Sequence, residues 1–153
     1  IDNYWVFDKC LGDNIELCDI MIETEEKIYL VHVKSGFDAK MRDLSNQIII
    51  SAKRLKNSLD SGNLKFINQV VDSYNKNDLL LPKIKDSNSF LKKFKEKSIT
   101  YVLAFKSTWK SGKNIKDNLD KANSNIAKYS LIQCIKEMNT TSYPISIVEI
   151  RNS

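Results

Sequence analysis

The chain has 153 residues and a formal net charge of +5, from 24 Lys and Arg against 19 Asp and Glu. This length suits one hydrophobic core, so we expect residues 1–153 to form a single domain. The only histidine is His32, which excludes a zinc site built from several histidines and means that any His-dependent triad must include this residue. The three cysteines show no C-x-x-C spacing, which argues against disulfides and favours a reducing compartment, the cytoplasm.

The sequence also bears on membranes, on the extent of the chain and on its partners. It contains no apolar run long enough to span a membrane and no leader pattern, so we expect no membrane association. The chain begins with Ile1, and we expect it to be a fragment of a longer protein. Residues 1–26 carry eight acids and one base, whereas residues 27–153 carry 23 bases and 11 acids. A basic body favours an anionic partner such as nucleic acid, and an acidic patch can hold a divalent cation, although many such charges only solvate helix faces.

In chain order, β-branched and aromatic runs predict strands first. Residues 3–8 form the first, and residues 11–14 form a turn. The next two strands, residues 16–22 and 27–34, form a hairpin through the polar residues between them.

The rest of the chain alternates between helical and strand patterns. Apolar residues recur at three- and four-residue steps between residues 38 and 59, which predicts an amphipathic helix that ends near Gly62. The remaining predicted segments are helices at 64–71, 87–97 and 127–138, a buried central strand at 99–105, an exposed loop that begins near 107, and a last strand at 145–150. This order predicts an α/β fold with a mixed central sheet flanked by helices.

The predicted hairpin brings three chemically active side chains together. With a two- or four-residue loop, Asp19 lies directly opposite His32, and Lys34 shares the face of His32. Such a group supports metal-assisted phosphodiester cleavage, with Asp19, His32 and the Val33 carbonyl as ligands of Mg²⁺ or Mn²⁺ and Lys34 as the catalytic cation. An ordinary cross-strand polar network explains the same spacing equally well. A loop of three or five residues would turn Asp19 to the wrong face.

A polar stripe follows on the next helix. It consists of Lys40, Asp43, Gln47, Ser51 and Arg54, at helical spacing beside the apolar stripe. Gln47 could contact substrate or a metal-bound water, while Lys40, Arg42 and Arg54 are candidates for contacts to nucleic-acid phosphates. The stripe could equally be a solvent face.

These residues carry a resemblance. A strand meander with Asp19 in its second strand, His32-Val33-Lys34 in the third and Gln47 on the next helix resembles the PD-(D/E)XK, or restriction-endonuclease-like, nuclease superfamily. More closely, the chain is similar to an uncharacterised family of sporadically distributed bacterial proteins with an I-H-V-K motif. The similar segments are Glu16-Leu-Cys-Asp19, Val31-His-Val-Lys34, Met41-Arg-Asp-Leu-Ser-Asn-Gln47, Ser51-Ala52 and the closing segment from Tyr129 to Ile150.

The resemblance implies a restriction-endonuclease-like core and a metal-dependent endonuclease that cleaves DNA rather than RNA, with a role in bacterial defence. It implies that Asp19 binds the metal, that Lys34 assists catalysis and that Gln47 supports the site. His32 departs from the superfamily pattern, which has Glu or Asp at this position, and the acidic helix that commonly precedes the strands is absent from the sequence. Histidine at this position is a feature of the closer family.

Two alternatives remain. The first is a catalytically inert nuclease-like module that binds nucleic acid or a partner protein. A second copy of the chain, in a homodimer, is one such partner. The second is a thiol enzyme that uses Cys18 and His32, but strand alternation sets Cys18 on the face opposite Asp19. Tyr101, Phe105 and Trp109 could stack on bases, although core packing is the better interpretation of Tyr101 and Phe105, which lie on a predicted buried strand.

Overall fold

A five-stranded mixed sheet forms the centre of the protein. The structure is a computed structural model and describes residues 3–80, 82–106, 109 and 114–151. The strand order is β1-β4-β5-β6-β7, in which the first three strands run antiparallel and the last three run parallel. Their bounds are β1 Tyr4–Val6, β4 Ile20–Glu23, β5 Lys27–Ser35, β6 Ser98–Lys106 and β7 Ile145–Ile150. The predicted mixed α/β architecture, with a strand meander followed by a central strand, is therefore confirmed.

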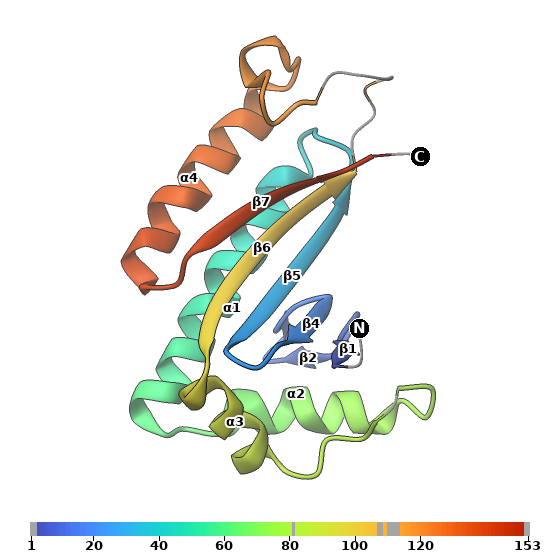
Figure 1. Ribbon diagram of the computed structural model, residues 1–153, viewed down its shortest axis with the longest axis vertical. Helices are drawn as coiled ribbons and strands as arrows, with labels where there is room; N and C mark the ends of the chain where they lie inside the picture. The colour runs from blue at the N-terminus through green and yellow to red at the C-terminus, as the bar shows by residue number, and fades with distance from the viewer. Residues whose placement is uncertain (1–2, 81, 107–108, 110–113, 152–153) are drawn as a thin grey trace.

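In the described part of the chain, four α-helices accompany the sheet. They are α1 Met41–Ser61, α2 Lys65–Lys76, α3 Ser87–Glu96 and α4 Asn125–Thr141, and a short 3₁₀ turn, η1, covers Leu119–Lys121. Figure 1 shows α1 and α4 packed against each other behind the sheet, while α2 and α3 lie at its lower end. None of the described helices is both long and apolar enough to cross a bilayer.

The core forms between the sheet and α1. Ile28, Leu30 and His32 alternate along β5 and are buried on the side that α1 covers. The predicted apolar stripe of α1 is buried against them, from Met41 to Leu55. Tyr101 and Phe105 of β6 have no exposed surface, which confirms that they pack in the core.

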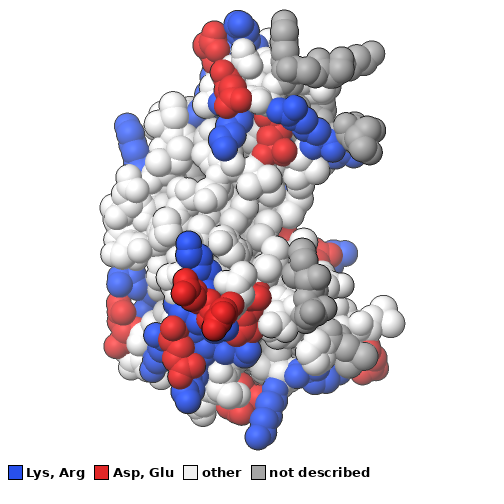
Figure 2. Space-filling view, in the orientation of Figure 1, with Lys and Arg blue, Asp and Glu red and all other residues white. Residues whose placement is uncertain are grey.

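Among the described residues, no helix covers the opposite face of the sheet. It carries the alternate residues of each strand, including Val6, Val148 and Ile150, which are 37%, 44% and 40% exposed. In Figure 2, in the same orientation, the middle of the molecule is almost free of charged residues, and its outline is hollowed on the right. The helices therefore stabilise the sheet from one side and from one end.

A small hairpin precedes β4. The predicted turn at residues 11–14 lies within it, between the short strands β2 Leu11–Gly12 and β3 Ile15–Glu16. Gly12 lies against α2 so closely that a Cβ atom would lie 2.7 Å from the carbonyl oxygen of Phe66. As a result, the predicted strand 16–22 is split, and only its second half joins the central sheet.

The helix ends follow their local chemistry. The carboxylate of Asp86 accepts a hydrogen bond from Ser89 N at the start of α3, and the hydroxyl of Ser124 accepts one from Ala127 N at the start of α4. Gly62 ends α1 with φ +70°, as its position in the sequence predicts. α2 extends five residues beyond its predicted end, because the fully buried Tyr74 continues its apolar face.

Candidate metal and catalytic site

The candidate site lies where β4 ends beside the longer strand β5. β4 pairs with β5 only from Ile28 to Val31, whereas β6 pairs with all nine residues of β5. The register, with Ile20 opposite Val31, is the predicted one, and its continuation brings Asp19 opposite His32. Asp19 N donates to Val31 O at 2.9 Å, and Val33 N donates to the Asp19 carboxylate at 2.5 Å. The Asp19 carboxylate therefore accepts the hydrogen bond from Val33 N that a backbone carbonyl of a longer β4 would have accepted.

Two further carboxylates join Asp19. Asp8 follows β1, Glu16 ends β3, and each of the three side chains offers an oxygen within 4.8 Å of the others. Asp8 is exposed, whereas the other two are partly buried. We call these three residues the acidic group. Carboxylate oxygens are the ligands that Mg²⁺ and Mn²⁺ prefer, so the donor set fits a hard divalent cation.

Electrostatics in the acidic group favour a bound cation. Burial raises the pKa of Glu16, the charge of Asp19 raises it further, and a hydrogen bond from Lys9 N at 3.2 Å opposes the rise. Burial also raises the pKa of Asp19, against the opposing effect of the Val33 N–H. Carboxylates that repel one another in a partly dry site gain most when a cation neutralises them.

Lys34 accompanies the acidic group from β5. Its positive charge opposes the rise in the pKa of both Glu16 and Asp19. The side chain is partly buried. The register of β4 and β5 sets Lys34 on the same face of the sheet as Asp19.

His32 lies in the protein interior. It has no exposed area, and its ring stacks on Tyr101 at 6.1 Å between centroids, with 14° between the ring planes. Burial lowers the pKa of His32 to about 4, and the Leu17 backbone opposes this shift although its geometry falls short of a hydrogen bond. Among the described residues, neither ring nitrogen has a hydrogen-bond partner, and His32 is not a member of the acidic group.

Sequence reasoning missed Asp8 and Glu16. Glu16 precedes Asp19 by three residues within the Glu16-Leu-Cys-Asp19 motif, but a continuous strand would have turned the two side chains to opposite faces. The break after β3 removes that constraint. The other signal in the sequence was Asp8, an acidic residue at the end of the first predicted strand.

The polar stripe of α1 divides into two parts. Gln47 is exposed and lines a pocket of about 260 Å³ with Asp43 and Glu16, so it lies beside the acidic group. Ser51 is instead fully buried, and its hydroxyl donates to Leu17 O at 2.6 Å. The prediction that Ser51 lines a surface site is therefore wrong, because this residue reaches inward to the chain segment before β4. The predicted phosphate contacts, Lys40, Arg42 and Arg54, are all exposed.

The cysteines are unsuited to nucleophilic catalysis. Cys10, Cys18 and Cys134 are free and buried. Burial raises the pKa of the Cys18 thiol well above its usual value, with smaller contributions from Asp19 and Glu16. A protonated, inaccessible thiol does not support the Cys18–His32 alternative.

Comparisons with known proteins identify no relative. No protein-family model matches the chain, and no match is found among curated proteins or solved structures.

Proposed function

We propose that the chain is a metal-dependent nuclease domain with a restriction-endonuclease-like core, and that it cleaves phosphodiester bonds of DNA in preference to RNA. The observation that carries this proposal is the acidic group, whose three side chains each offer an oxygen within 4.8 Å of the others, with the charge of Lys34 acting on Glu16 and Asp19. The sequence resemblance supports the same function through Asp19, Lys34 and Gln47. Bacterial defence is the biological role that this resemblance favours.

The chemistry follows from the residues present. Asp8, Glu16 and Asp19 would hold Mg²⁺ or Mn²⁺, which supplies Lewis acidity at a phosphate oxygen. The Lys34 ammonium stabilises the negative charge that develops on the phosphoryl oxygens as the attacking oxygen approaches phosphorus. Gln47, which lines the same pocket as Glu16, orients the substrate or a water molecule. The superfamily pattern has an acidic metal ligand at the position of His32. In this proposal Glu16 takes the role of that ligand.

Cleavage assays test the proposal directly. Purified protein is incubated with plasmid DNA and with RNA in Mn²⁺ or Mg²⁺, alongside Lys34→Ala and Glu16→Gln. The matched controls are Lys136→Ala on α4 and Glu96→Gln on α3, both exposed residues away from the acidic group. We expect both site variants to lose at least 100-fold in rate, since Lys34→Ala removes a positive charge at the reacting phosphate and Glu16→Gln removes a proposed metal ligand. Cleavage that is absent from the wild type, or equal in Lys34→Ala and its control, contradicts the proposal.

Pulsed electron paramagnetic resonance of bound Mn²⁺ distinguishes the two ligand sets. We expect only oxygen ligands, from the acidic group. A nitrogen coupling that disappears in His32→Leu would instead identify His32 as a ligand. Salt-sensitive nucleic-acid binding that needs no metal and gives no turnover would identify the inert module.

A further inference from the structure

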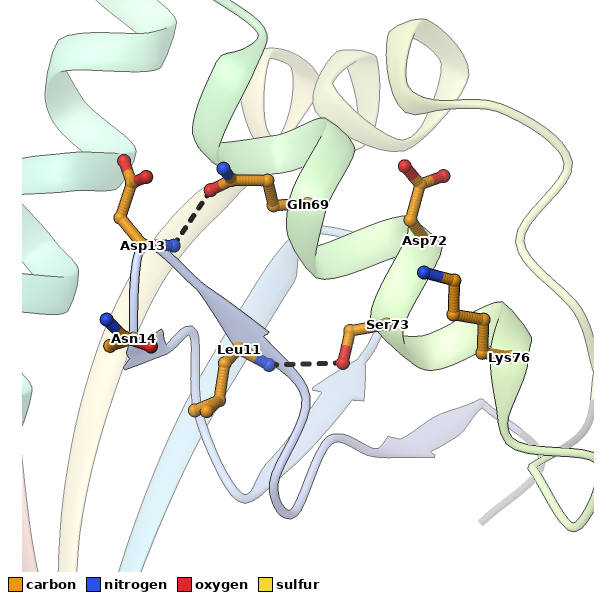
Figure 3. Close-up of a pocket in the computed structure, with 7 residues that line it drawn as sticks. All are labelled: Leu11, Asp13, Asn14, Gln69, Asp72, Ser73 and Lys76. Atoms are coloured by element: carbon orange, nitrogen blue, oxygen red, sulfur yellow. Dashed lines mark hydrogen bonds between the residues drawn. The ribbon is translucent and has the colours of Figure 1, made fainter.

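Three surface hollows meet at the β2–β3 hairpin. The pocket beside Gln47 shares Leu11 and Asn14 with the larger hollow between this hairpin and α2, which Figure 3 shows. That hollow shares Asp13 with a third one, which Arg54 and Lys65 line. The first and third hollows lie along α1. We call the surface that these two form between α1 and the hairpin the hairpin groove.

One face of α1 lines both hollows of the hairpin groove. The residues of this face recur at three- and four-residue steps along the helix: Asp43, Gln47, Ile50, Arg54 and Asn57. From Asp43 to Asn57 the wall is about 20 Å long by the rise of an α-helix, which spans several nucleotide phosphates. The end near Gln47 adjoins Glu16 of the acidic group, and the far end carries Arg54.

The opposite wall is held in place by α2. Asp13 N donates to the Gln69 side-chain oxygen at 2.8 Å, and Leu11 N donates to the Ser73 hydroxyl at 3.3 Å, the two dashed lines of Figure 3. Gly12 packs directly on Phe66 between them. These contacts join the hairpin to a helix, so the groove needs no ordering when a ligand binds.

The lining of the groove is suited to a sugar–phosphate chain. Arg54 and Lys65 supply positive charge at the end away from the acidic group, and Lys65 also pairs with Asp13 at 3.5 Å. Leu11 and Ile50, 40% and 41% exposed, offer apolar contact between the two ends. Side-chain amides supply hydrogen bonds along the walls, from Asn14, Asn46, Gln47, Asn57 and Asn63. Cations and amides make most protein contacts to nucleic-acid phosphates and sugars.

We propose that the hairpin groove binds the backbone of the nucleic-acid strand that is cut, on one side of the scissile phosphate. The strand leaves the acidic group past Gln47, crosses Asn14 and reaches Arg54 and Lys65. It follows α1 rather than the hollow of Figure 3, because among the described residues Lys76 is the one cation that lines that hollow, beside Asp13 and Asp72, whereas Arg54 and Lys65 both line the groove and Lys65 pairs with Asp13 there. This inference rests on the proposed function and assigns its substrate-binding surface.

Binding measurements test the groove separately from cleavage. The probe is a fluorescein-labelled 20-nucleotide DNA, single-stranded or duplex, measured by fluorescence anisotropy in Ca²⁺ so that cleavage is slow. The variants are Arg54→Gln and Lys65→Gln, and the matched control is Lys136→Gln on α4. All three side chains are exposed, so the core is left intact. Thermal unfolding of each variant checks this.

We expect each groove variant to weaken binding by about fivefold or more. Each should also lower the slope of log K against log salt by about one, because one phosphate contact is lost. The control should stay within about twofold of the wild type.

Each outcome has a separate meaning. Groove variants that bind as the control does, in a wild type that binds and cleaves DNA, overturn the hairpin groove and leave the nuclease proposal intact. A wild type that neither binds nor cleaves overturns both.

Discussion

The hydroxyl of Ser51 donates a 2.6 Å hydrogen bond to the carbonyl oxygen of Leu17 in the protein interior. Because this bond uses the hydroxyl proton of Ser51, the Tyr101 hydroxyl 3.2 Å away must be the donor of the second bond in the chain. Leu17 lies between two members of the acidic group, Glu16 and Asp19. Two buried hydrogen bonds thus connect β6, through α1, to the segment that carries the candidate ligands.

Replacement of Ser51 should weaken both the fold and metal binding at the proposed site. We expect Ser51→Ala to lower the free energy of unfolding by about 1–3 kcal/mol, because Leu17 O and the Tyr101 hydroxyl lose their partner in the interior. Mn²⁺ affinity, measured by calorimetry, should fall by more than in other variants of equal stability. Ser51→Thr keeps the hydroxyl and should restore part of the affinity.

Ser45 provides the matched control on the same helix. It is also buried, but among the described residues its side-chain oxygen has no hydrogen-bond partner. We therefore expect Ser45→Ala to be neutral or slightly stabilising in urea unfolding, since it removes a buried unsatisfied hydroxyl. Equal losses in Ser45→Ala and Ser51→Ala would show that the Ser51–Leu17 bond contributes nothing specific.

Glu23 holds α3 to the hairpin between β4 and β5. Its nearly buried carboxylate accepts hydrogen bonds from Lys93 at 2.7 Å and Lys97 at 2.6 Å. Glu23→Gln should destabilise the protein by about 1–3 kcal/mol in urea unfolding, because it leaves two ammonium groups without their counter-charge. Glu96→Gln breaks only the exposed pair with Lys92 and should cost less than about 0.5 kcal/mol.

The pH dependence of this pair has a defined sign. Burial opposes ionisation of Glu23, but the bonds from Lys93 and Lys97 outweigh it, so the pKa is lowered in the folded state. The stabilisation is therefore complete above the unfolded-state pKa of the carboxyl and is lost as pH falls through the lowered value. Urea unfolding of Glu23→Gln should lack this acid-dependent component, and an unchanged pH profile would contradict the assignment.

His32 should make the protein sensitive to mild acid. Its pKa falls from 6.5 to about 4 on burial, so below pH 6.5 the unfolded chain binds a proton that the folded protein refuses. Stability should decline by about 1.4 kcal/mol per pH unit between these two values from this residue alone. Urea unfolding of His32→Leu should flatten that part of the profile. An imidazole NMR signal that titrates near pH 6.5 in the folded protein would disprove this prediction.

Gly12 should not tolerate a larger residue. The added methyl group of Gly12→Ala would lie 2.7 Å from Phe66 O and 2.8 Å from the Phe66 ring, so the hairpin must move away from α2. We expect a loss of about 1–3 kcal/mol by thermal unfolding, together with weaker Mn²⁺ binding, since Glu16 ends the same hairpin. If Gly12→Ala is as stable as the wild type, the prediction is wrong and α2 moves away from the hairpin at no cost in free energy.

Much of the fold could be predicted from local patterns. The apolar spacing from Met41 to Leu55 sets the buried face of α1, and Gly62 ends that helix with a positive φ. The register of β4 and β5 is the one that a two- or four-residue loop gives, because only an even loop keeps Asp19 on the face of His32. The loop length itself could not be predicted, since the acidic turn contains no Asn-Gly or Gly.

The missed features depend on contacts between distant residues. Strand propensity alone does not reveal that α2 packs against Gly12, and this packing accompanies the break of the strand after Glu16. In a continuous strand, side chains three residues apart point to opposite faces, so Glu16 and Asp19 would not be predicted on the same face. Ser51 has a polar side chain at a plausible surface position, and its burial depends on a partner 34 residues away in the sequence.

The unequal lengths of β4 and β5 give the Asp19 side chain a structural as well as a chemical task. Its carboxylate takes the Val33 N–H just beyond the last residue pair of β4 and β5, so one residue both ends a strand pairing and begins a candidate site. If β4 and β5 paired over two further residues, the Asp19 carboxylate would belong to an ordinary side chain of the sheet. In this chain, the position of any chemistry at Asp19 is therefore decided by where backbone pairing stops.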